Sequence, residues 1–224
     1  MRSDRVADAP ALRTRIGSSA FLTTSLLVGR LVLMRLDTRT SLIDVAIGQV
    51  RRQGYSAFSY ADLADVTGLR KPSIHHHFPS KEDLGVAMVA TYAERFSEDL
   101  ARIDAGHGTA IERLRAYARL YRQGLSTEQG CLCGILASEV AVLPARVQAG
   151  VRQFFQLNLR WLERVLRDGT DSGQLGRHVE PRRDARTVLA TLQGATLVAL
   201  SMQQPASFDH AVDGLLAGLA AARA

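Results

Sequence analysis

The sequence predicts an all-α protein in which an amino-terminal three-helix domain, arranged as a helix-turn-helix, precedes a larger helical domain. Apolar residues recur at helical spacing along most of the 224 residues, with Ser, Thr or Pro at the start of these stretches and Gly at their ends. Hydrophobic residues make up 46% of the chain and aromatic residues only 6%, which suits helices rich in Ala and Leu. The chain is long enough to bury one or two substantial cores.

Residues 1–36 do not share this helical pattern. They combine a basic start with the apolar run AFLTTSLLVGRLVLM, which superficially resembles a signal peptide. Arg30 interrupts the run, no small-residue cleavage site follows it, and the run is too short and too charged for a transmembrane helix. We therefore expect a disordered basic arm or a mis-called extension, and no membrane partner.

Residues 40–53 are predicted to form the first helix of the amino-terminal domain. Two arginines suit its carboxyl end, and Gly54 ends it. Its apolar residues lie on one stripe and comprise Leu42, Val45, Ala46 and Val50. This helix is expected to support the segment that follows.

The sequence of residues 59–84 predicts two short helices, a tight turn between them and the capped start of a third helix. The Ser59 hydroxyl can accept a hydrogen bond from a free backbone N–H of the first turn. Gly68 supplies the left-handed backbone position that ends this helix. A small residue, a turn glycine and an apolar residue then follow at the spacing of a helix-turn-helix, namely Ala64, Gly68 and Ile74.

The second of these helices is expected to start at about Lys71, with Pro72 in its first turn, where a missing N–H has no cost. Phe78 would close the small core, and Ser80 with Asp83 would cap the next helix. The exposed face would carry Arg70, Lys71, Ser73, His75 and His76. Turn glycines and capping serines also occur in three-helix domains that never bind DNA, so the spacing alone does not decide the function.

The run from Gly68 to Leu84, GLRKPSIHHHFPSKEDL, resembles the signature of the tetracycline-repressor (TetR/AcrR) family. The resemblance implies a homodimeric, all-helical transcription regulator, most simply a repressor released from a palindromic operator in double-stranded DNA by a small molecule or electrophile. It also implies an amino-terminal DNA-binding domain and a carboxy-terminal ligand-binding and dimerisation domain. In that family the first helix starts a few residues after the initiator, so Met34 is a second candidate for the translation start.

The resemblance assigns roles residue by residue. It implies that Lys71, Ser73 and His76 meet bases in the major groove and that Lys81 contacts a phosphate. His75 departs from the family pattern, which usually has a tyrosine there, although a histidine can still donate to an oxyanion. The predicted DNA-binding set is Thr40, Ser59, Tyr60, Arg70, Lys71, Ser73, His75, His76 and Lys81. The predicted domains are residues 37–85 for DNA binding and residues 86–224 for effector binding and dimerisation.

Charge and cysteine content agree with this interpretation. The formal net charge is +6, which favours a polyanionic partner. Lys71 and Lys81 are the only lysines in the chain, and both lie in the motif. Two cysteines are too few and too close for a disulfide framework, so we expect a cytoplasmic protein.

The larger domain is predicted to contain long amphipathic helices. Residues 81–105 would link the two domains, Thr109 would cap the next helix, and residues 145–166 would form another. Residues 181–202 carry almost no charge after Arg186, so this helix must be buried on more than one side. Together with a last helix at about residues 208–222, it predicts a four-helix dimer interface. The alternative is two ordinary core helices of a monomer.

Candidate effector-binding residues are the inward aromatic or polar groups of this domain, namely Tyr117, Tyr121, Cys131, Phe155, Trp161 and Gln193. Cys131 and Cys133 are also candidate redox residues, because a thiol at a helix start can have a lowered pKa. The run GCLCGILASEV resembles a branch of the family that contains electrophile and oxidant sensors. The alternative is that both cysteines are small buried hydrophobes.

We expect no metal, no cofactor and no enzymatic activity. Consecutive helical residues point about 100° apart, so the imidazoles of His75, His76 and His77 cannot converge on one ion. No nucleophile and base, carboxylate pair or phosphate-binding loop occurs at a useful spacing, and Ser138 with Glu139 suits a helix face better than a catalytic pair. The alternative functions are a thiol-based redox or electrophile-handling enzyme and a helical interaction protein.

Overall fold

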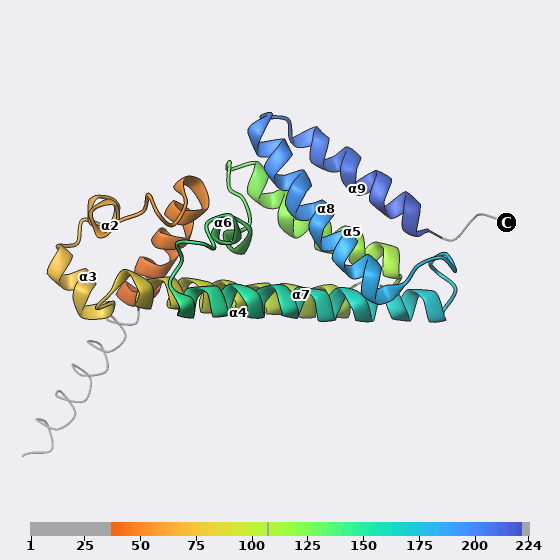
Figure 1. Ribbon diagram of the computed structural model, residues 1–224, viewed down its shortest axis with the longest axis horizontal. Coiled ribbons are helices and arrows are strands. Elements are labelled where there is room, and N and C mark those ends of the chain that lie inside the picture. The colour runs from red at the N-terminus through yellow and green to blue at the C-terminus, as the bar shows by residue number, and fades with distance from the viewer. Residues whose placement is uncertain (1–36, 107, 221–224) are drawn as a thin grey trace, which may run out of the picture. The chain divides into compact units, whose positions relative to one another are not determined.

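The computed structural model describes residues 37–106 and 108–220, and every regular element in these ranges is a helix apart from one isolated bridge between Leu175 and Ala220 (Figure 1). Residues 37–53 are helical. The other helices are α2 (Tyr60–Thr67), α3 (Lys71–His77), α4 (Lys81–Gly106), α5 (Ala110–Leu125), α6 (Leu132–Ser138), α7 (Ala145–Asp171), α8 (Pro181–Ser201) and α9 (Pro205–Leu219). The all-α prediction is confirmed.

The described residues from Ser41 onward belong to one compact unit. The predictions for residues 1–36, including Met34 as a start, lie outside the described residues. No helix in the two described ranges is both long enough and apolar enough to cross a membrane.

Two predicted helix boundaries are wrong. The helix expected to end at residue 166 continues to Asp171 as α7, because Gly169 packs inside the helix instead of ending it. A Cβ atom on Gly169 would lie only 2.6 Å from the Cβ of Ala110. The last helix starts three residues earlier than expected, with Pro205 in its first turn, and it ends at Leu219.

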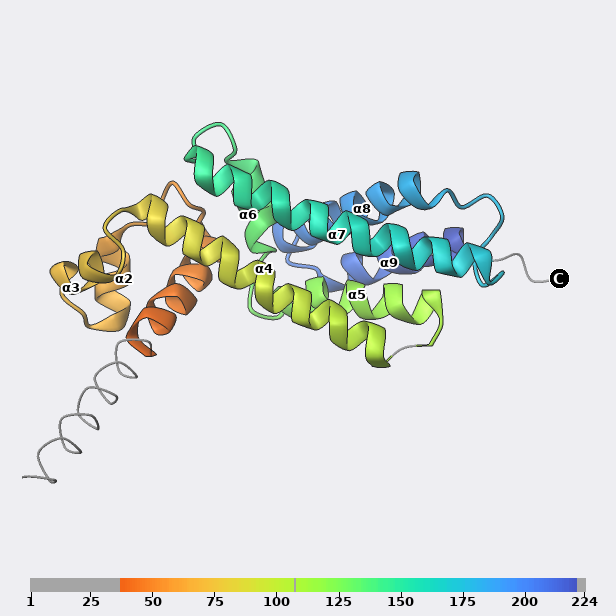
Figure 2. The same cartoon turned by 90° about the horizontal axis from the view of Figure 1, so that it is seen from below.

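Within residues 41–224, α7 runs alongside α4, and α8 packs between α7 and α9 (Figures 1 and 2). α5 contacts α4, α7, α8 and α9, so it lies at the centre of the larger domain. Short α6 contacts α4 and α7. α4 therefore runs from the helix-turn-helix directly into the core of the larger domain.

The core of the larger domain contains an aromatic cluster at the junction of α4, α5 and α7. Tyr117 is fully buried, and its ring stacks on that of Trp161 with the ring centroids 5.2 Å apart. Phe96 meets the Tyr117 ring edge to face at 6.0 Å. The Tyr117 hydroxyl donates to Oδ1 of buried Asn158 at 2.6 Å, so the one polar end of this side chain is satisfied.

Candidate functional site

The helix-turn-helix is held by the local signals that its sequence contains. Ser59 caps α2, because its hydroxyl accepts hydrogen bonds from the backbone N–H groups of Ala61 and Asp62. Gly68 ends α2 at φ 69°, in the left-handed region. Ser80 and Asp83 form a cap at the start of α4, where the backbone N–H of Asp83 donates to the Ser80 hydroxyl at 3.1 Å. The predicted starts of all three helices are confirmed.

α3 presents a face to solvent that contains no acidic residue. Ile74 is fully buried beneath the helix, and Phe78 at its end is buried too. The exposed residues on or beside α3 include Arg70, Lys71, Ser73, His75 and His76. A polyanion can approach this face without meeting a carboxylate on the helix itself.

A concave surface of about 510 Å³ brings five of the nine predicted DNA-binding residues together. They are Ser59, Tyr60, Lys71, His75 and Lys81. Arg70, Ser73 and His76 remain exposed but do not line this surface. Thr40 is exposed, and its phosphate contact stays a prediction.

Three of these side chains already make contacts within the domain. The Ser59 hydroxyl donates to Oδ2 of Asp62 at 2.6 Å. The Tyr60 hydroxyl lies 2.9 Å and 2.7 Å from the carbonyl oxygens of Phe78 and Ser80, and burial raises the pKa of Tyr60 to about 12. The His75 ring packs on that of Tyr60 at 4.8 Å. Ser59 and Tyr60 therefore fix the position of α3 first, and their hydroxyl protons are not free for a phosphate.

Lys81 extends along the aromatic edge of the domain. Its ammonium lies 4.5 Å from the centroid of the Tyr55 ring and 3.5 Å from the carbonyl oxygen of Ser56. Partial burial lowers the pKa of Lys81, although the nearby carboxylates of Glu139 and Asp62 oppose this shift. The charge is therefore held at the edge of the concave surface instead of moving freely in solvent.

Glu139 joins this domain to the segment that follows α6, and the sequence-based interpretation of Glu139 as part of a plain helix face missed this role. Its carboxylate accepts hydrogen bonds from the backbone N–H groups of Tyr55 at 2.7 Å and Ser56 at 2.8 Å, and from the Ser56 hydroxyl. Gly54, at φ 86°, allows this approach, because a Cβ atom there would lie 2.4 Å from Oε1 of Glu139. Two segments more than 80 residues apart are thereby connected.

The other end of α6 is connected to the same domain through Arg51. Nε of Arg51 donates to the carbonyl oxygen of Gly130 at 2.6 Å, one residue before the α6 N-cap, Cys131. Arg51 belongs to the helix of residues 37–53. Both ends of α6 are therefore held to residues 51–56.

The structure brings only some of the predicted effector-binding residues together. Tyr117 and Tyr121 share a hydroxyl contact of 3.1 Å, and Trp161 stacks on Tyr117. Phe155 is half-buried and packs on Phe154. On α8, the Gln193 side chain lies against Gly134 of α6, and its amide nitrogen is buried without a hydrogen-bond partner among the described residues.

The two cysteines are both buried. Cys133 is completely inaccessible, and burial raises the pKa of its thiol well above the usual value, which favours the unreactive thiol. Cys131 is 7% exposed and lies next to the Tyr92 hydroxyl. Burial raises the pKa of Tyr92 well above 10, and its hydrogen bond to Cys131 raises it further, so Tyr92 is a neutral phenol at physiological pH.

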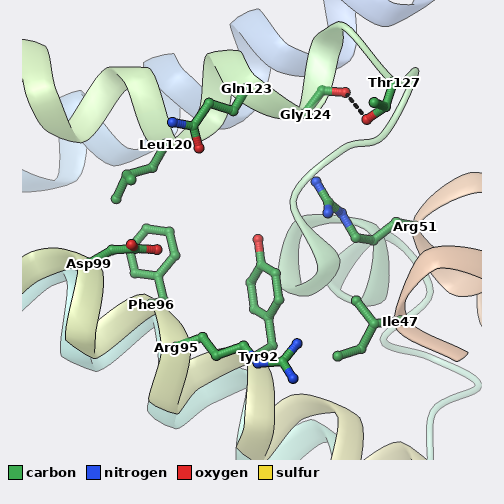
Figure 3. Close-up of a pocket in the computed structure, with 10 residues that line it drawn as sticks. All are labelled: Ile47, Arg51, Tyr92, Arg95, Phe96, Asp99, Leu120, Gln123, Gly124 and Thr127. Carbon is green, nitrogen blue, oxygen red and sulfur yellow. Dashed lines mark hydrogen bonds between the residues drawn. The ribbon is translucent and has the colours of Figure 1, made fainter. Parts of the chain in front are cut away.

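A cavity of about 290 Å³ opens between the helix of residues 37–53, α4 and α5 (Figure 3). Figure 3 shows the Tyr92 hydroxyl and the Arg51 guanidinium both directed into it. The other lining residues are Ile47, Arg95, Phe96, Asp99, Leu120, Gln123, Gly124 and Thr127. None of the six predicted effector-binding residues lines it. No local sequence signal could have found this cavity, because helices distant in the sequence form its walls.

Two family models match the chain. One described as "Bacterial regulatory proteins, tetR family" matches residues 42–88, and one described as "Tetracyclin repressor-like, C-terminal domain" matches residues 110–215. The transcriptional regulator AcuR of Cereibacter sphaeroides is 27% identical over 71% of this chain and 74% of its own length. The HTH-type transcriptional repressor NemR of Escherichia coli K12 is 29% identical over 73% of this chain and 84% of its own length.

Solved structures agree with these matches. A TetR-family regulator from Agrobacterium tumefaciens has 33% identity, with a TM-score of 0.80 over 84% of this chain and all of that chain. The reduced form of E. coli NemR has the same fold, with a TM-score of 0.75 at 23% identity over 84% of this chain and all of that chain. The chain therefore belongs to the tetracycline-repressor family of DNA-binding transcriptional regulators.

Proposed function

We propose that this protein is a homodimeric repressor that binds a near-palindromic operator through α3 and leaves it when an effector binds the larger domain. The observation that carries this proposal is the concave surface beside α3, which is lined by both lysines of the chain and by His75, while α3 itself contains no acidic residue. Two-fold symmetry would place two such helices in successive major grooves. Like the family's regulators in general, it would act by binding and not by catalysis.

The DNA contacts divide into two kinds. Lys71, Ser73 and His76 are exposed on α3 and would meet base edges. Lys81 is held at the rim by Tyr55 and would contact a phosphate. Ser59 and Tyr60 would act mainly by holding α3 in place.

Replacing Lys71 with alanine is expected to weaken specific binding by about 1–3 kcal/mol and to leave non-specific binding nearly unchanged. Lys81→Ala should weaken both alike and reduce the slope of log K against log salt by about 1. The measurement is fluorescence anisotropy on an operator selected from a random-sequence pool and on a scrambled duplex, at several salt concentrations. The division of roles fails if both variants lose sequence preference equally. Wild-type protein that selects no sequence from the pool would refute operator binding.

The proposed dimer interface is the exposed surface of α8 and α9. Leu197 and Val198 are each about half exposed on α8, although they are large and apolar. Gly194, Gly214 and Gly218 have open space around them, so a second copy could approach these helices closely. Two α8–α9 pairs would then form a four-helix interface.

Val198→Glu is expected to convert the dimer into monomers, because it would bury two unpaired carboxylates in a symmetric interface. Sedimentation velocity gives the oligomeric state directly. Val142→Glu is the matched control, because Val142 is 66% exposed and lies outside both helices. The proposed interface is wrong if the Val198 variant remains a dimer.

Release from DNA would follow binding of a small molecule or an electrophile to the larger domain. Cys131 is the candidate for an electrophile, because it is less buried than Cys133 and lies at the α6 N-cap. Gln193 is a candidate for a hydrogen bond to an effector, because its amide nitrogen is buried with no partner among the described residues. Either event would act on α6, whose two ends hold the DNA-binding domain.

A further inference from the structure

The cavity between residues 37–53, α4 and α5 contains a cation that its surroundings do not neutralise. Among its lining residues, Arg95 pairs with Asp44 at 2.5 Å, and Asp99 pairs with Arg102. The ion pairs formed by the described residues include none with Arg51. Its Nε is used by the carbonyl oxygen of Gly130, which is neutral. The lining residues therefore carry a net charge of +1: two arginines against one aspartate.

The cation that is not neutralised lies at one end of the cavity, and the other end combines apolar side chains with Asp99 and Gln123 (Figure 3). Figure 3 shows Arg51, Gly124 and Thr127 at one end and Phe96 and Leu120 at the other, with the Tyr92 hydroxyl between them. The Thr127 hydroxyl donates to the carbonyl oxygen of Gly124 at 3.1 Å, which directs this proton away from the cavity. The donors left at the Arg51 end are the terminal guanidinium nitrogens of Arg51, because the single proton of the Tyr92 phenol is shared with Cys131.

We propose that this cavity binds a small monocarboxylate with an apolar body. A guanidinium forms its best hydrogen bonds with a planar carboxylate, and one unpaired positive charge matches one negative charge. The volume of about 290 Å³ is at the lower end of ligand sites, which excludes large conjugates. Ile47, Phe96 and Leu120 would contact the apolar body.

The position of Arg51 gives this site a regulatory consequence. The guanidinium that would bind the carboxylate is the group that holds Gly130 at the start of α6. A ligand carboxylate on the terminal nitrogens would pull the guanidinium whose Nε holds the neutral carbonyl of Gly130, and the charged acceptor is the stronger one. Ligand binding would therefore weaken the connection between α6 and the helix of residues 37–53. This regulatory consequence rests on the proposed function, whereas carboxylate binding in the cavity does not.

The test is isothermal titration calorimetry of the full-length protein, free of DNA, with benzoate, benzamide and inorganic phosphate. Benzoate is expected to bind saturably and at least about tenfold more tightly than its neutral isostere benzamide or than phosphate. Arg51→Gln should remove this preference. Arg52→Gln is the matched control, because it removes the same charge from the neighbouring residue, which does not line this cavity.

A second variant tests the same site in case Arg51→Gln does not fold. Gln123 is exposed and lines the cavity, so Gln123→Glu adds a negative charge there without changing the size of the side chain. It should weaken benzoate binding at least about tenfold, whereas Gln156→Glu on α7 should leave it unchanged. The proposal is overturned if benzamide or phosphate binds as well as benzoate, if benzoate does not bind, or if the Arg51 and Arg52 variants behave alike.

Gel shifts separate this site from the proposed function. Benzoate binding without any sequence-specific DNA binding would leave the site standing and refute the repressor. Specific DNA binding by a protein that does not bind benzoate would refute the site and leave the repressor standing.

Discussion

Replacing Tyr117 with alanine is expected to lower the free energy of unfolding by about 3–5 kcal/mol. The Tyr117 side chain is fully buried, stacks on Trp161 and meets Phe96 at its edge, so truncation leaves a cavity that these rigid neighbours cannot fill. Truncation also leaves the buried Asn158 without its hydrogen-bond donor. Urea denaturation followed by circular dichroism measures the change. A loss below about 1 kcal/mol would mean that the aromatic cluster is not packed as described.

Tyr117→Phe separates packing from hydrogen bonding at this site. The ring and its contacts remain, so the expected loss is the cost of the hydrogen bonds that the hydroxyl makes with Asn158 and Tyr121, about 1–3 kcal/mol. Both variants should keep the fold of α2 and α3, which Tyr117 does not touch. A Tyr117→Phe variant as unstable as Tyr117→Ala would show that the hydrogen bond, not the ring, stabilises this region.

This role of Tyr117 also shows the limit of choosing a ligand pocket from sequence. Periodicity correctly predicted that Tyr117, Tyr121 and Trp161 point inward. It could not tell whether their neighbours fill the space, since packed core and open pocket have the same pattern of residues. The cavity beside Arg51 is walled by helices that are distant in the sequence, and an arginine in the last turn of a helix is locally an ordinary end signal. 

The helix-turn-helix was predictable because its determinants are local. The Ser59 and Ser80 caps, the left-handed Gly68 and Pro72 in the first turn each act within four residues of their partners. Arg51 and Glu139 act over 79 and 84 residues of sequence, and no local rule connects such pairs. The predicted end of α7 was wrong for the same reason, because the packing of Gly169 depends on Ala110 and Leu175, which are distant in the sequence.

The connection made by Glu139 should be measurable as a pH-dependent contribution to stability. Burial raises the pKa of this carboxyl, but the hydrogen bonds from Ser56 and Tyr55, together with Lys81, outweigh burial and hold the pKa below its ordinary value of 4.5. A carboxyl whose pKa is lower in the folded state stabilises the fold above its unfolded pKa. The stabilisation disappears as the pH falls through the folded value.

Glu139→Gln is therefore expected to lower the free energy of unfolding by about 1.5–3 kcal/mol at pH 7. One end of the amide is a donor and would face the N–H donors of Tyr55 or Ser56. The difference from wild type should hold between pH 7 and 5 and shrink below about pH 4.5, as wild type loses the charge. Urea denaturation from pH 3 to 7 measures it.

Glu163→Gln is the matched control, because Glu163 pairs with Arg167 on the surface of α7. Glu163→Gln should lower the free energy of unfolding by about 0.5 kcal/mol or less, as is usual for an exposed ion pair four residues apart on a helix. Equal effects of the two variants at pH 7 would show that Glu139 is only another surface charge. If Glu139 does hold the DNA-binding domain to α6, its variant should also bind operator nearly as wild type does but respond less to effector, because coupling between two sites needs the contact that joins them.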